Sequence, residues 1–168
     1  MGAMGVVVPM VKTVEEAECI VRATRLPPEG IRSWGPLRGS HYGFDTEDYL
    51  RRINNNILVV LIVETREAVD NLDAIAAVPG VDVLTLGPWD LSLSLGLNPL
   101  DLPLPEVDAV LSRMVEVART GQVSAGGGVD TPEELREFYA RGVMFLEFGT
   151  DYSLLANAVQ QSLRVFRE

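Results

Sequence analysis

The stretch IVETREAVDNLDAIAAVPGVDVLTLGPWDLSLSLG, residues 62–96, contains the clearest succession of secondary-structure signals in the chain. It begins within the apolar run 57–63, continues with apolar residues at helical spacing, and stops at the Val-Pro-Gly sequence 78–80. A second apolar run, 81–86, follows, and the turn 87–89 leads into another predicted helical turn. Two apolar strands joined by a helix in this way are typical of a βαβ unit with parallel, buried strands.

The same alternation extends outward in both directions. Further apolar runs occupy residues 5–10, 123–129 and 144–148, and further helical stripes occupy residues 14–24, 107–118 and 155–166. Capping boxes at Thr13 with Glu16 and at Thr131 with Glu134 predict two helix starts. The series of βα units predicts an α/β fold with a mostly parallel sheet and a single domain over residues 1–168. On pattern alone, an open doubly wound, flavodoxin-like binding module also fits.

Composition narrows the possible partners. The chain carries 24 acidic and 14 basic residues, a net charge of -10, which disfavours nucleic acid and anionic membrane surfaces because their phosphates would be repelled. Cys19 is the only cysteine, so no internal disulfide is expected, which fits a reducing cytoplasm. The first ten residues lack a basic segment, and no apolar run approaches the length of a membrane span. We therefore expect a soluble, cytoplasmic protein.

Two carboxylates follow two of the predicted strands. Glu64 ends one strand, and Asp90 comes just after the next, so on neighbouring strands they would lie about 5 Å apart. Such a pair can share one divalent ion, which would leave coordination positions for a 2-oxo acid and act as a Lewis acid on its ketone oxygen. The backbone N–H groups of Trp89 and Asp90, at a helix start, are predicted to bind the substrate carboxylate. The alternative is that both acids only cap helices in ordinary βα loops.

Five stretches, in this order and spacing, resemble the HpcH/HpaI family of metal-dependent class II pyruvate aldolases, of the 4-hydroxy-2-oxoheptanedioate aldolase type. They are VVVPMVKTVEEA (6–17), RLPPEGIRSWGP (25–36), VETREAVDN (63–71), GVDVLTLGPWDLS (80–92) and FGTDYSLLA (148–156). The resemblance implies a (β/α)8 TIM barrel of the phosphoenolpyruvate/pyruvate-domain type. It also implies Mg2+, Mn2+ or Co2+ bound by Glu64 and Asp90, and reversible aldol cleavage to pyruvate and an aldehyde. The family further implies homo-oligomers that exchange the last helix, here 151–166.

The chain departs from the family pattern in three respects, one of which is the bulky Trp89 beside the expected ligand, which predicts a different acceptor pocket. The match begins at the fourth strand, so the resemblance implies an incomplete barrel that lacks the first three βα units, with this chain as its carboxyl-terminal part. The family's catalytic arginine and histidine come from that missing part, so we expect no catalytic residue within this chain. In addition, Ile62 stands where many members carry a glutamine. A truncated, catalytically inactive subunit that binds a metal or a partner is therefore an alternative to an active aldolase.

Three basic residues lie in the Pro- and Gly-rich stretch 26–45, the longest irregular segment of the chain. A loop of this length is more often functional than idle. His41, the only histidine, does not stand at the family's histidine position, and we expect it to be a solvated loop residue. Arg32 and Arg38 can reach an anionic substrate from this loop, but pairing with surface carboxylates is the favoured interpretation.

Overall fold

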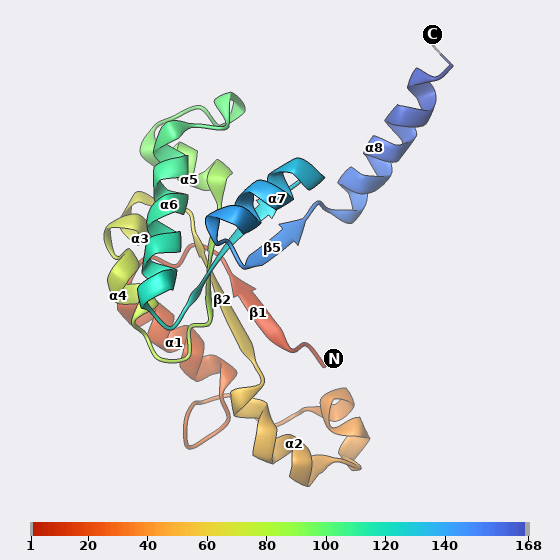
Figure 1. The fold of residues 1–168 in the computed structure, drawn as a ribbon. Coiled ribbons are helices and arrows are strands. Elements are labelled where there is room, and N and C mark those ends of the chain that lie inside the picture. Colours follow the sequence, from red (N-terminus) through yellow and green to blue (C-terminus); the bar gives the residue numbers. More distant parts are fainter. Residues whose placement is uncertain (1, 167–168) are drawn as a thin grey trace.

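A curled sheet of five parallel strands organises the computed structural model, which describes residues 2–166 apart from the side chain of residue 120 (Figure 1). Each strand pairs in parallel with its sequence neighbour. The strands are β1 (Gly5–Val8), β2 (Leu58–Val63), β3 (Val83–Leu86), β4 (Ser124–Val129) and β5 (Phe145–Phe148). All five strands predicted from apolar runs are confirmed.

The order of the strands distinguishes a barrel segment from an open doubly wound sheet. The strands lie side by side in sequence order, β1-β2-β3-β4-β5, so every helical connection moves in the same direction around the sheet. A flavodoxin-like sheet instead reverses direction at a switch point, where its ligand binds. The architecture is therefore an α/β half-barrel with flanking helices, and the flavodoxin-like alternative is wrong.

Helices follow the strands as the apolar stripes predicted. The helical segments are α1 (Val14–Thr24), η1 (Leu37–Gly43), α2 (Thr46–Arg52), η2 (Ile53–Asn55), α3 (Arg66–Asp70), α4 (Leu72–Ala76), α5 (Pro88–Leu95), η3 (Pro99–Asp101), α6 (Pro105–Thr120), α7 (Pro132–Arg141) and α8 (Asp151–Arg164). The capping boxes at Thr13 and Thr131 are confirmed, and a third at Thr150 starts α8. The stripe after β2 is divided at Asn71 into α3 and α4, where the Asn71 side chain donates to the carbonyl of Lys12 at 2.9 Å.

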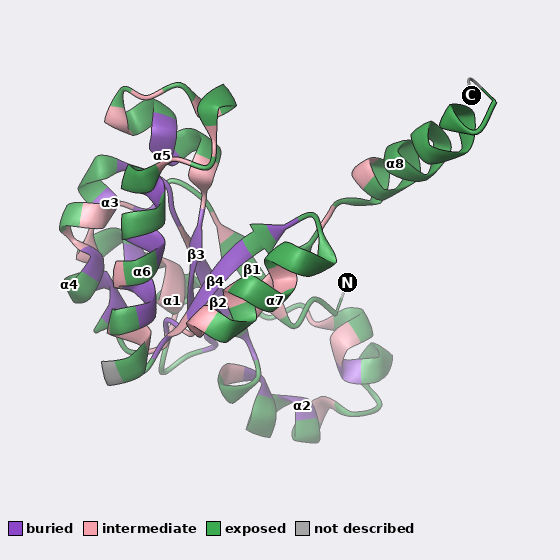
Figure 2. Ribbon diagram, turned by 45° about the horizontal axis from the view of Figure 1, so that its top comes forward, coloured by how far each residue is buried: buried purple, intermediate pink, exposed green. Residues whose placement is uncertain are grey.

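The hydrophobic core lies between the sheet and the helices on its outer face (Figure 2). Because side chains alternate along a strand, every second residue of β2 and β3 points to these helices. The core includes Val59, Leu61 and Val63 from β2, Leu84 and Leu86 from β3, and Leu72, Ile75, Leu111 and Met114 from α4 and α6. On the opposite face, side chains are buried in the middle of the sheet, as at Val60, but exposed at its β1 edge, where Val7 is 51% exposed.

The irregular segment after α1 is fixed to the amino-terminal end of the sheet. The buried Arg25 side chain donates from Nη1 to the carbonyl of Ile57 at 3.1 Å, just before β2. The Asn54 amide pairs with the backbone of Leu26 in both directions, at 2.7 Å and 3.0 Å. These hydrogen bonds join the start of the segment to its end. The following residues, with η1 and α2, therefore lie beside the strand starts (Figure 1).

Among residues 2–166, no helix combines the length and apolar character that crossing a bilayer requires.

Candidate metal and substrate site

Glu64 is buried at the carboxyl end of β2, with 5% of its surface exposed. Its Oε1 accepts a hydrogen bond of 2.6 Å from the backbone N–H of Met10. Met10 lies beyond the end of β1, which stops at Val8 because Pro9 has no N–H to donate and Met10 turns to a φ of 59°. Among the described residues, no fully buried side-chain oxygen lacks a hydrogen-bond partner. The second oxygen of Glu64, which has no such partner, therefore keeps access to the adjoining pocket.

Asp90 is brought to the same pocket by the turn after β3. The N–H of Gly87 donates to the carbonyl of Val63 at 3.0 Å, so this turn runs directly beside the end of β2. Helix α5 begins at Pro88, and Asp90 is its third residue. Glu64 and Asp90 both line a pocket of about 430 Å3. The structure thus brings together the two carboxylates that the sequence singled out.

Hydrogen bonds between the two βα loops stabilise this arrangement. The N–H of Arg66, at the start of α3, donates to Ser94 Oγ of α5 at 2.9 Å. The pocket is lined by these residues and by further charged groups of both signs: Lys12, Arg66, Glu67 and Asp70. The positive charges of Lys12 and Arg66 partly offset the negative charges of the carboxylates in this lining, which are Glu64, Glu67, Asp70 and Asp90.

The donor atoms fit a hard divalent cation. Within residues 2–166, no three His, Cys, Asp or Glu side chains are grouped as metal ligands. That excludes a structural zinc site of four protein ligands within the described part of this chain. Mg2+ commonly takes one or two carboxylates and keeps its other positions for water or substrate oxygens. Glu64 and Asp90 supply such a pair.

The first turn of α5 offers backbone donors beside this pair. The first helical hydrogen bond runs from the N–H of Leu91 to the carbonyl of Gly87 at 3.0 Å, so the N–H groups of Trp89 and Asp90 precede the helical ladder. Trp89 is 56% exposed and is not among the residues that line the pocket, whereas Asp90 is. The part expected of the Trp89 N–H in binding therefore stays a prediction.

The sequence analysis did not single out Glu147. Continuing the strand pairing by one residue places Glu64 beside Gly87 and Gly87 beside Gly128, which pairs with Glu147. These four positions form one layer on the inner face of the sheet. Glu147 Oε1 accepts a hydrogen bond from Thr85 Oγ1 at 3.3 Å. Strand alternation is the signal that could have found this residue, since Phe145 and Glu147 share one face.

Two other residues weighed from the sequence do not serve this pair. His41 lies in η1 and contacts Asp45 at 2.5 Å, away from the pocket of Glu64. Ile62 points to the same sheet face as Glu64, because one residue lies between them and side chains alternate between the two faces along a strand. Its apolar side chain supplies no hydrogen bond there.

Gly87 is required for the position of Glu64. A Cβ atom at residue 87 would lie 2.7 Å from Glu64 Cβ and 2.8 Å from its Oε2. Gly87→Ala should therefore displace the carboxylate and weaken divalent metal binding about 10-fold or more, the range seen when a ligand's support is lost. Titration with Mn2+, followed by electron paramagnetic resonance, measures the affinity.

Gly128→Ala is the matched control, because a Cβ at that position of the same layer meets nothing within 4 Å. The control should bind Mn2+ as the unaltered chain does. Equal affinities for the two alanine variants would contradict the assignment of Glu64 as a ligand.

Comparisons with known proteins agree with this architecture. A family model described as HpcH/HpaI aldolase/citrate lyase matches residues 1–158. The 2-keto-3-deoxy-L-rhamnonate aldolase of Escherichia coli (strain K12) is 35% identical over 168 residues, covering 99% of this chain and 62% of that protein. The chain thus spans 62% of the length of the curated relatives it matches.

Solved structures share the fold at comparable identity. An HpcH/HpaI aldolase/citrate lyase family protein from Burkholderia cenocepacia J2315 superposes with a TM-score of 0.90 at 31% identity, covering 99% of this chain and 66% of that one. A citrate synthase superposes with a TM-score of 0.83 at 30% identity, covering 99% and 64%. The relatives therefore include proteins named for two different reactions.

Proposed function

The chain belongs to the HpcH/HpaI aldolase/citrate lyase family, and on that premise we propose that it forms part of a divalent-metal-dependent carbon–carbon lyase. The reaction is the reversible cleavage of a 4-hydroxy-2-oxo acid into pyruvate and an aldehyde. The observation that carries this proposal is the convergence of Glu64 and Asp90 on one pocket at neighbouring strand ends. Active sites of parallel barrels collect at that end of the sheet.

In this proposal, Glu64 and Asp90 hold the cation, which is Mg2+, Mn2+ or Co2+. When bound, the cation supplies a Lewis acid that stabilises negative charge on the ketone oxygen of the 2-oxo acid. The Met10 N–H keeps Glu64 oriented, since it occupies one carboxylate oxygen and leaves the other for the ion. The N–H groups of Trp89 and Asp90 bind the substrate carboxylate at the amino terminus of α5.

The cleavage itself requires groups beyond this pair. The bond between C3 and C4 breaks, the C4 hydroxyl loses its proton as the aldehyde forms, and the electron pair passes to C3. The resulting enolate of pyruvate then takes a proton at C3. We assign neither proton transfer to a residue of this chain, because its pocket contains no histidine and its second acid pair, Glu67 and Asp70, lies on α3 rather than at a strand end.

Exchange at the pyruvate methyl group tests the proposal. In D2O, Mg2+ bound at this site would act as a Lewis acid on the ketone and ease the loss of methyl protons to solvent. Nuclear magnetic resonance should therefore show loss of the methyl proton signal, and excess EDTA should abolish this loss. Exchange that is insensitive to EDTA, or no exchange and no metal binding, would contradict the proposal. Metal binding without exchange would instead identify the alternative: a non-catalytic metal-binding subunit.

We also propose that the chain is a homo-oligomer in which α8 packs on another subunit. Helix α8 extends away from the sheet and has no buried residue (Figures 1 and 2). Its exposed apolar side chains are Tyr152, Leu154, Leu155, Val159 and Leu163. A helix with so large an apolar stripe requires a partner surface. Light scattering should therefore report more than one chain per particle, and a monodisperse monomer would contradict this proposal.

A further inference from the structure

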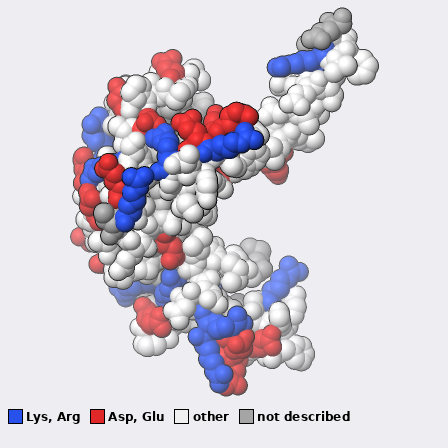
Figure 3. Space-filling view, viewed as in Figure 1, with Lys and Arg blue, Asp and Glu red and all other residues white. Residues whose placement is uncertain are grey.

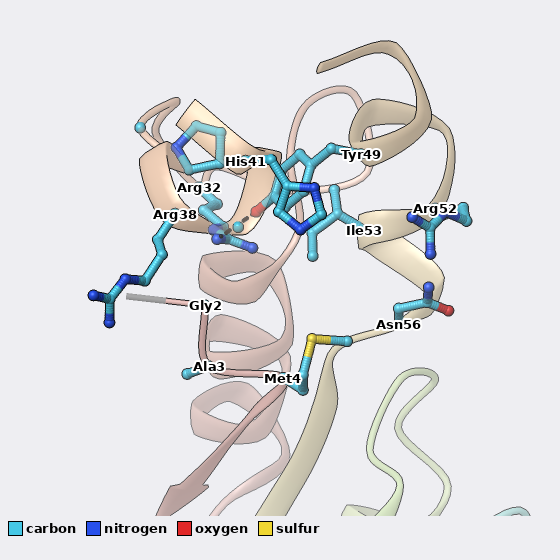
Figure 4. Close-up of a pocket in the computed structure, with 13 residues that line it drawn as sticks. Gly2, Ala3, Met4, Arg32, Arg38, His41, Tyr49, Arg52, Ile53 and Asn56 are labelled. Atoms are coloured by element: carbon cyan, nitrogen blue, oxygen red, sulfur yellow. Dashed lines mark hydrogen bonds between the residues drawn. The ribbon is translucent and has the colours of Figure 1, made fainter. Parts of the chain in front are cut away.

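A second pocket, of about 440 Å3, lies at the opposite end of the sheet from Glu64. Met4, just before β1, and Asn56, just before β2, form one side of it (Figure 4). The other side is formed by the irregular segment after α1, together with η1 and α2. A pocket of this size accommodates a small organic molecule.

The lining of this pocket is cationic in an otherwise acidic chain. Arg32, Arg38, Arg52 and His41 line it, and no Asp or Glu does so among the described residues. This contrasts with the net charge of -10 for the whole chain. Acidic and basic side chains lie side by side over α2 (Figure 3), so the arginines that matter for the pocket are those without a carboxylate contact.

Two of the three arginines have no carboxylate partner among the described residues. Arg52 pairs with Asp48, and His41 contacts Asp45. In contrast, neither Arg32 nor Arg38 forms an ion pair within residues 2–166, so the interpretation that they pair with surface carboxylates is wrong.

Their observed partners are phenol hydroxyls, which do not neutralise a guanidinium. Arg32 Nη2 donates to the Tyr49 hydroxyl at 3.0 Å, and Arg38 Nε donates to that of Tyr42 at 3.5 Å. Figure 4 shows the Arg32 head directed toward the pocket interior beneath Tyr49, whereas Arg38 extends past the rim near Gly2 and Ala3.

Helix η1, which supplies Arg38, Gly39 and His41 to the pocket wall, also contains unusual backbone conformations. Leu37, His41 and Tyr42 have φ angles of 26°, 47° and 58°. Apart from these three, Met10, which holds Glu64, is the sole non-glycine residue with a positive φ within residues 2–166. A positive φ at a non-glycine residue costs energy and persists only where the surrounding packing holds it. Such residues are concentrated at ligand and active sites.

We propose that this pocket binds the phosphate group of a small phosphorylated molecule. Guanidinium groups match the tetrahedral oxygens of a phosphate, and Arg32 directs into the pocket a guanidinium that has no carboxylate partner within residues 2–166. Arg38, which also lacks a carboxylate partner there, extends past the rim and adds positive charge at the mouth of the pocket. The Asn56 amide at the rim offers further donors. Met4 and Ile53 provide apolar surface for the carbon skeleton. This site is independent of the proposed lyase function.

Titration calorimetry with glycerol 3-phosphate and with inorganic phosphate tests the proposal on the full chain. EDTA is included so that no metal ion at the Glu64 site recruits the anion. Saturable binding is expected with a Kd below about 1 mM. Arg32→Gln should weaken it about 10-fold or more, because one charge-assisted contact is lost. Arg136→Gln, which removes an exposed arginine of α7 paired with Glu133, should leave it unchanged.

A second variant separates loss of binding from loss of folding, because Arg32→Gln also removes the contact with Tyr49. Asn56→Asp keeps that contact and adds a carboxylate at the exposed rim, so phosphate affinity should fall while the melting temperature stays constant. No binding of either phosphate at 10 mM (a concentration about ten times the expected Kd) would overturn the proposal. Equal affinity for acetate, or unaltered phosphate affinity in both pocket variants, would do the same.

Discussion

Glu64→Gln should weaken the binding of Mn2+ or Mg2+ by about 100-fold or more, with little effect on folding. Removing a partner that merely orients a metal ligand costs about 10- to 100-fold in affinity, so removing a charged ligand atom costs at least the upper value. Glutamine retains the shape of the side chain, and its carbonyl oxygen can still accept the Met10 N–H. Titration calorimetry with Mn2+ measures the change, and thermal unfolding verifies the fold.

Glu67→Gln provides the matched control for this variant. Glu67 lines the same pocket and bears the same charge, but it lies on α3 and is exposed rather than buried at a strand end. Its replacement should change the affinity by about 3-fold or less, since only a long-range charge is lost. If the two variants bind Mn2+ equally, Glu64 is not a ligand and the proposed lyase loses its metal.

The fold followed from local signals in the sequence. All five strands were predicted because each is an apolar run bounded by turn residues, and both predicted capping boxes begin helices. These features depend on residues close together in the chain. The division of the helix after β2 at Asn71 was not predicted, because it accompanies a hydrogen bond to Lys12, 59 residues away.

The candidate site was predicted less completely, because it also depends on contacts between residues that are far apart in the chain. Glu64 and Asp90 were identified because each follows an apolar strand, and strand ends of a parallel sheet meet at one edge. The Met10 N–H, the Ser94 hydroxyl and the layer that includes Glu147 come from other βα units. Their positions depend on register and backbone angles that residue types do not specify. The contact of Arg32 with the Tyr49 hydroxyl, 17 residues away, likewise depends on tertiary packing.

The conformation of the segment that carries Arg32 depends on Gly30, which packs against the carboxyl-terminal end of α1. The N–H groups of Ile31 and Arg32 donate to the carbonyls of Arg22 and Arg25 at 2.8 Å and 2.9 Å, so the chain doubles back against the helix terminus. Gly30 lies within this turn. A Cβ there would clash with both carbonyl oxygens and would lie 2.7 Å from Arg25 Cβ. Backbone oxygens cannot rotate away as a flexible side chain can.

Gly30→Ala should therefore destabilise the fold by about 3 kcal/mol, the upper part of the range for overpacked sites. For a chain of this size, that corresponds to a fall of about 6–12 °C in melting temperature. Gly128→Ala is the control, since it adds the same methyl group to open space and should change the melting temperature by less than about 2 °C. Differential scanning calorimetry measures both variants. Similar melting temperatures would show that the turn at Gly30 can move away from α1, and the positions assigned to Arg25 and Arg32 would then be incorrect.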